Sequence, residues 1–180
     1  KNSFDISIAD GSIDCIYLFN SSLCCVYQND IRNERQLMNN ICQGIVIEKC
    51  EKTTIISNNI SFVRNGIVIS GDTILISQNT ITDTIVGLAT KLPTTNPILI
   101  KNITITNNIL QRNANSNIYL SGVTHTEITG NQIVNSNGYG IYIEDNFFTS
   151  SEEITISRNT LHSNTLAIEV AGSFSVIIEY

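Results

Sequence analysis

The chain has 180 residues, a net charge of −6 and few charged side chains. This balance argues against a nucleic-acid-binding protein, which needs a clustered basic surface, and against binding to an acidic membrane surface. No apolar stretch is long enough for membrane insertion and no signal-peptide pattern begins at Lys1. The length is sufficient for one domain with its own core, which we place at residues 1–180.

Short β segments recur along the chain in the pattern I-[ST]-x-N-x-[IL], followed by G-I-x-I. Residues 73–77, 103–105 and 153–156 illustrate the first half, in which apolar and polar residues alternate. Such alternation with β-branched residues predicts strands with one buried face. The second half occupies, in chain order, residues 15–18, 44–47, 66–69, 87–90, 117–120, 140–143 and 165–168.

An asparagine recurs at the fourth position of the first half of the pattern. The residues are Asn29, Asn59, Asn79, Asn108, Asn131 and Asn159. A period of roughly 20–30 residues built from short strands and turns predicts a solenoid. Asparagine suits a corner because it tolerates left-handed backbone geometry and bonds its own backbone. We therefore expect a structural ladder of amides about 4.8 Å apart.

Five cysteines, Cys15, Cys24, Cys25, Cys42 and Cys50, lie in the first third of the chain. They form no C-x-x-C motif and no histidine lies near them in sequence, so we expect no metal site and no cofactor. Buried thiols are the main interpretation. A disulfide between coils stays open, because the sequence does not determine its pairing.

Three of the coils are longer than the others and hold extra loops, at residues 32–43, 91–97 and 144–152. All three loops flank the G-I-x-I strand rather than the asparagine corner. Loops on one side of a repeat fold usually wall a binding face. We therefore expect the binding face on the G-I-x-I strands.

Aromatic side chains occur at outward positions of these strands. We number the first position of each G-I-x-I segment, the glycine slot, as zero. Side chains at positions +2 and +4 of the strand then point outward. The +2 row contains Tyr17, Tyr119 and Tyr142, and Asp145 directly follows the strand of Tyr142. Tyrosine rings offer an amphipathic surface that suits the faces of sugars. We predict that these residues contact a glycan.

Two glutamates, Glu144 and Glu169, fall in the +4 row of adjacent coils when the last coil is aligned on residues 165–168. One carboxyl group of such a pair can protonate a leaving oxygen while the other acts as base or nucleophile. Neighbouring coils would hold the two groups about 5 Å apart, the separation typical of retaining glycosidases. The pair is our first catalytic hypothesis.

The whole pattern resembles the right-handed parallel β-helix of pectate lyases, polygalacturonases, alginate epimerases and phage tailspike depolymerases. The resemblance covers essentially the whole chain and implies an all-β, single-stranded helix of about seven coils. Polygalacturonases carry a D-D-C-I-x-I strand, and Asp14 with Cys15 and Ile16 matches it with a single acid. The resemblance thus makes Asp14 a third catalytic candidate. No polar caps are visible, so we expect a segment of a longer helix.

The resemblance implies a polysaccharide partner and a depolymerase, either hydrolase or lyase, of tailspike or pectinase type. It also implies an extracellular, cell-surface or virion location. Two alternatives stay open: a non-catalytic adhesin or spike shaft, and a uronate epimerase. The uncapped strand around residues 176–178 leaves open a homo-oligomer, which would be a trimer in a tailspike.

Overall fold

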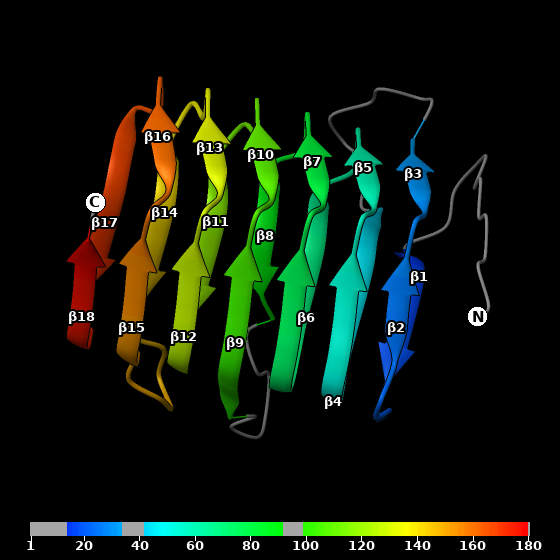
Figure 1. The fold of residues 1–180 in the computed structure, drawn as a ribbon, viewed down its shortest axis with the longest axis horizontal. Helices are drawn as coiled ribbons and strands as arrows, with labels where there is room; N and C mark the ends of the chain where they lie inside the picture. Colours follow the sequence, from blue (N-terminus) through cyan, green and yellow to red (C-terminus); the bar gives the residue numbers. More distant parts are fainter. Residues whose placement is uncertain (1–13, 34–41, 92–98, 180) are drawn as a thin grey trace.

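The computed structural model describes residues 14–33, 42–91 and 99–179, and within them the elements are all β-strands (Figure 1). The strands wind into a parallel β-helix whose coils each contribute to three faces. All strand pairs are parallel, so each coil hydrogen-bonds to the coils before and after it. The 6-stranded sheet corresponds to about six complete turns, close to the expected number.

The first face holds the G-I-x-I strands. Its strands are β1 (Asp14–Phe19), the first half of β4 (Gln43–Ile56), the first half of β6 (Asn65–Ser77), β8 (Val86–Thr90), β11 (Ser116–Ser121), β14 (Tyr139–Glu144) and β17 (Leu166–Ala171). Both β4 and β6 continue around the corner onto the second face without a loop.

The second face follows in each coil and consists of β2 (Cys25–Tyr27), the second halves of β4 and β6, β9 (Ile100–Thr106), β12 (Val123–Thr129), β15 (Glu152–Ser157) and β18 (Phe174–Glu179). The third face consists of β3 (Asp30–Arg32), β5 (Asn59–Ser61), β7 (Thr80–Thr82), β10 (Ile109–Gln111), β13 (Gln132–Val134) and β16 (Thr160–His162).

Inward-pointing aliphatic side chains fill the coil interior. Ile45, Ile67, Leu88, Ile118 and Ile141 form one such column on the first face, each with 0% exposure. Removal of this apolar surface from water stabilises each coil only when a neighbouring coil is stacked on it. The core therefore extends along the helix axis, and the outward positions are left for function.

The asparagine ladder is present, with one correction to the sequence prediction. Each ladder amide donates to the next, for example from Asn58 Nδ2 to Asn79 Oδ1 at 2.9 Å and from Asn79 Nδ2 to Asn108 Oδ1 at 3.0 Å. The ladder consists of Asn29, Asn58, Asn79, Asn108, Asn131 and Asn159. The prediction of Asn59 is wrong. Because Ile60 points into the core, period-two alternation turns Asn59 outward, where it donates to Asp30 Oδ1 at 3.0 Å.

The left-handed backbone at this corner belongs to the residue before each ladder asparagine. These residues are Gln28, Ser57, Gln78, Asn107, Gly130 and Arg158, with φ between 53° and 66°. The ladder asparagines themselves are not among the positive-φ residues. Their role is to satisfy buried backbone groups, as when Asn108 Nδ2 donates to the carbonyl of Ile76 at 2.9 Å.

No helix in the described part of the chain is long and apolar enough to cross a membrane. The described residues also hold no group of three or more His, Cys, Asp or Glu side chains that could hold a metal ion.

Candidate functional site

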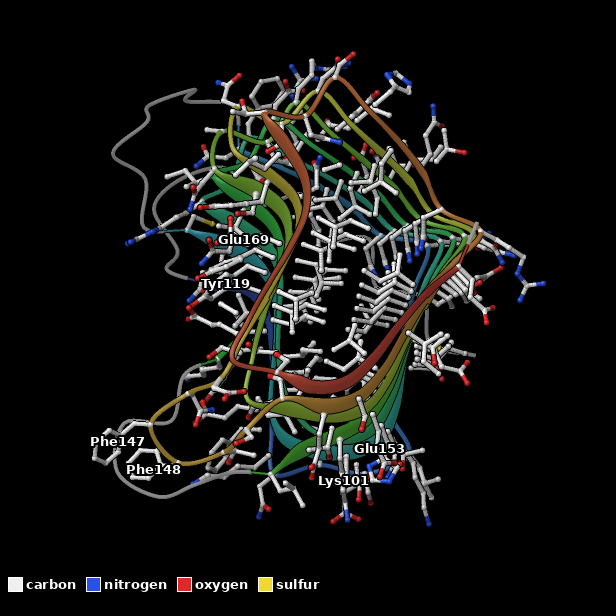
Figure 2. The ribbon with its side chains drawn as sticks, turned by 90° about the vertical axis from the view of Figure 1, so that its left-hand side faces the viewer. Lys101, Tyr119, Phe147, Phe148, Glu153 and Glu169 are labelled. Carbon is white, nitrogen blue, oxygen red and sulfur yellow. The ribbon has the colours of Figure 1, made fainter. Side chains whose placement is uncertain are left out.

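Three tyrosines and two glutamates lie together on the outside of the first face, over β11, β14 and β17. We call Tyr119, Tyr139, Tyr142, Glu144 and Glu169 the tyrosine–glutamate patch. The rings of Tyr139 and Tyr142 stack with centroids 4.7 Å apart, and the centroids of Tyr119 and Tyr142 are 5.6 Å apart. Figure 2 shows Tyr119 and Glu169 on the same outer side of the helix.

Glu144 is the centre of this patch, since both of its oxygens accept a phenol hydrogen bond. Tyr119 donates to Oε1, and Tyr142 donates to Oε2 at 2.8 Å. Burial, followed by the hydrogen bond to Glu144, raises the pKa of Tyr119 above its ordinary value. The bond to Glu144 raises the pKa of Tyr142 to about 12. Both phenols are therefore neutral hydrogen-bond donors at neutral pH.

Glu169 does not occupy the position that the sequence pattern predicts. Its register partner is Tyr142, whereas Glu144 pairs with Ala171. The prediction of adjacent carboxylates in one row is wrong because Ala167, and not Thr165, takes the glycine slot opposite Gly140. Glu144 and Glu169 therefore lie diagonally across neighbouring strands, and strand geometry places their Cα atoms about 8 Å apart.

A loop projects from the corner beside the patch, between β14 and β15, as the coil length predicts (Figure 2). Asp145 Oδ1 accepts from the Ser151 amide at 2.7 Å, and Asn146 Oδ1 accepts from the Phe148 amide at 2.8 Å. These bonds fix a tip whose Phe147 ring is 93% exposed. Asp145, expected to touch a glycan, thus holds the loop. The predicted loops at 32–43 and 91–97 fall largely outside the described residues.

A second cluster lies at the other end of the same face, and we call it the N-terminal cluster. Tyr17 donates to Glu48 Oε2 at 2.7 Å, and Lys91 Nζ lies 2.5 Å from the same oxygen. The Phe19 ring stacks on Tyr17 at 6.2 Å, and Lys49 Nζ lies 5.4 Å from the Phe19 centroid. The hydrogen bond from Lys91, followed by that from Tyr17, lowers the pKa of Glu48.

The structure does not bring Asp14 and Tyr17 to the tyrosine–glutamate patch. Both lie on β1, and the strand order from there runs β1, β4, β6, β8, β11 and β14. With neighbouring strands about 4.8 Å apart, β1 and β14 are separated by about 24 Å. Asp14 therefore shares no site with Glu144.

A groove of about 620 Å³ crosses the second face and was not predicted. It contains a contact between His125 Nε2 and Glu153 Oε2, 2.8 Å apart, and Figure 2 shows Glu153 on a different side from Tyr119. Non-glycine residues with positive φ line it at equivalent positions of successive coils, namely Asn102, His125, Glu153 and Ser175. None of its described lining residues is Phe, Tyr or Trp. It lacks the ring surface that favours sugar binding.

Residues 43–180 match the family model described as "Right handed beta helix region", and the chain belongs to this family. Comparison with curated protein sequences gives no match. The structure resembles that of the periplasmic alginate epimerase AlgG with a TM-score of 0.48 at 11% identity, over 90% of this chain and 50% of that one. It resembles the A-module of Azotobacter vinelandii mannuronan C-5 epimerase AlgE6 with a TM-score of 0.40 at 13% identity, over 87% of this chain and 57% of that one. The chain thus spans about half the length of these structures.

Proposed function

We propose that this member of the right-handed β-helix family binds a polysaccharide along its first face, at the tyrosine–glutamate patch. The observation that supports this most is the grouping of three tyrosine rings, two of which donate to the same carboxylate, Glu144. Rings give apolar surface for sugar faces, while phenols and carboxylates bond to sugar hydroxyls. The loop carrying Phe147 and Phe148 adds exposed rings beside this surface.

We further propose that the bound polysaccharide is cleaved, with Glu144 as the general base. Two phenols, those of Tyr119 and Tyr142, donate to its carboxylate and hold it on the outer surface of the first face. Glu169 is the second carboxyl group of the reaction, acting as acid in a hydrolysis. Its diagonal offset from Glu144 suits the wider separation of inverting glycosidases rather than the retaining separation. In a lyase, Glu144 would instead remove a proton from the sugar ring.

One observation favours a second function, glycan binding without cleavage. Each oxygen of Glu144 already accepts from a phenol, Tyr119 or Tyr142, so part of the hydrogen-bonding capacity of this carboxylate is already used. In that case the protein is an adhesin or a spike shaft. A uronate epimerase stays a third proposal, and it would change sugar stereochemistry without shortening the polymer.

The test is incubation of the full-length protein with a panel of bacterial and plant polysaccharides. Reducing ends, absorbance of unsaturated sugars, polymer length and sugar stereochemistry are followed together. Chain shortening that Glu144→Gln abolishes and Glu48→Gln retains supports the proposal. Cleavage that survives in Glu144→Gln rejects the catalytic role, and binding without any change in the polymer favours the adhesin.

A polysaccharide substrate implies work outside the cytoplasm, and we propose an extracellular or periplasmic location. Placement on a cell surface or a virion, and assembly into a trimer, stay predictions. Cell fractionation and light scattering of the full-length protein test them.

A further inference from the structure

Two cysteines from different coils meet at the start of the first face. Cys15 lies in β1, in the slot that glycine fills in β4 and β6, and Cys42 directly precedes β4. Their Sγ atoms are 3.3 Å apart. Cys42 is buried and Cys15 is half-buried against the core. Residues far apart in sequence are therefore held with their thiols in contact.

The other cysteines have different surroundings. Cys24 Sγ donates to the carbonyl of Ser22 at 3.6 Å, and Cys50 Sγ donates to the carbonyl of Glu48 at 3.4 Å. Cys25 is exposed. Cys15 and Cys42 are thus the pair that the fold itself brings together.

We propose that Cys15 and Cys42 form a disulfide-bonding site, which is oxidised by a small-molecule disulfide such as glutathione disulfide. A disulfide bond is about 2.05 Å long, so its formation has to shorten the sulfur separation of 3.3 Å by little more than 1 Å. Cys15 lies in β1 and Cys42 lies one residue before β4, the parallel neighbour of β1, in which Gln43 is the register partner of Asp14.

The reaction is two successive thiol–disulfide exchanges. The thiolate of Cys15, the more accessible of the two, attacks one sulfur of glutathione disulfide and releases one glutathione thiolate. The thiolate of Cys42 then attacks the Cys15 sulfur and releases the second glutathione. Two protein thiols lose two electrons and two protons, and glutathione disulfide becomes two glutathione molecules.

The bond would tie β1 to β4 and so hold the first described coil in place. Tyr17 lies on β1 and Glu48 on β4, so the cross-link also fixes the two strands that build the N-terminal cluster. A cross-link between residues distant in sequence stabilises a fold mainly by restricting the unfolded chain.

Thiol counting on the native protein tests the proposal. The protein is incubated with glutathione disulfide, denatured, alkylated with iodoacetamide and examined by intact mass and peptide mapping. Of the five cysteines, we expect Cys15 and Cys42 to escape alkylation and to appear in one linked peptide pair. The melting temperature should fall by about 5 °C on reduction.

Matched variants control for other thiol chemistry. Cys25→Ser removes the exposed thiol and should keep the link, whereas Cys15→Ser should leave Cys42 open to alkylation after denaturation. Alkylation of all five cysteines of the oxidised wild type, or a link between other cysteines, overturns the proposal. Because the decisive counts come from the wild-type chain, misfolding of a variant does not obscure the result.

Discussion

The two ends of the first face carry the same tyrosine-to-glutamate contact with different third partners. In each, a tyrosine at the +2 position of one coil donates to a glutamate at the +4 position of the next, as Tyr17 does to Glu48 and Tyr119 to Glu144. At the N-terminal end the glutamate also accepts from Lys91. At the other end it accepts from Tyr142.

This third partner separates the two clusters chemically. Lys91 neutralises Glu48, which becomes half of an ion pair. Glu144 accepts instead from two phenols, those of Tyr119 and Tyr142, which carry no positive charge. Between the clusters the outward +2 row consists of Val46, Val68 and Ala89, exposed by 1%, 5% and 7%. The same repeat positions therefore hold an ion-paired cluster at one end of the first face and a candidate site at the other.

The largest expected difference between the clusters is in turnover. Glu144→Gln removes the proposed base and should lower kcat by about 100-fold or more on a cleavable polysaccharide. Glu48→Gln should leave kcat within about twofold, because its carboxylate serves an ion pair. Steady-state kinetics on both variants measure this. Equal losses in the two variants would contradict the distinction drawn between the clusters.

A smaller effect is expected at Glu169. If it is the acid partner of Glu144, then Glu169→Gln should lower kcat by about tenfold or more and remove the alkaline limb of the pH–rate profile. Glu127→Gln, on the second face, is the matched control and should change neither. An unaltered pH profile in Glu169→Gln would remove Glu169 from the reaction.

Removal of one phenol hydroxyl should have a weaker effect. Tyr142→Phe keeps the ring but deletes the donor to Glu144 Oε2, so glycan binding should weaken by roughly three- to tenfold. Tyr17→Phe deletes the equivalent donor at Glu48 and should leave binding unchanged. Isothermal titration with the same oligosaccharide compares the two. Matching losses would indicate that the glycan reaches both clusters.

The smallest effect concerns stability and pH. The folded-state pKa of Glu48 is lowered, so its contribution is present above its ordinary value of 4.5 and is lost as the pH falls through the folded-state pKa. Lys91→Met should cost less than about 1 kcal/mol at pH 7, since this pair is partly exposed. It should also flatten the acid dependence of denaturant unfolding. A dependence equal to that of wild type would exclude the Lys91–Glu48 pair as its source.

The fold could be predicted because every coil repeats the same alternation of apolar and polar residues. The errors lie in the assignment of single residues to positions within that repeat. At Asn58 and Asn59 two asparagines compete, and the inward direction of Ile60 decides between them. The last coil has no glycine at the first position of the G-I-x-I segment. The sequence pattern therefore places this segment at residues 165–168, two residues before its position in the structure. The pair of Ile168 with Ile141 sets the true register.

The side-chain clusters were less predictable than the rows that carry them. The +2 and +4 rows follow from strand alternation, and they placed Tyr119, Tyr142 and Glu144 correctly on one face. Nothing in the alternation predicts that Lys91 reaches Glu48 across an intervening coil. That contact depends on rotamers and on the small Ser70 between them in the row. The second-face groove likewise depends on left-handed residues that are not glycines.

The proposed glycan-binding site is the tyrosine–glutamate patch and not the N-terminal cluster. The most direct test is a binding isotherm for one oligosaccharide with the wild type, Tyr142→Ala and Tyr17→Ala. We expect a loss of about 100-fold in affinity for Tyr142→Ala, because the ring that contacts both other tyrosines of the patch is removed, and no loss for Tyr17→Ala. Unchanged affinity in Tyr142→Ala, or the larger loss in Tyr17→Ala, would contradict it.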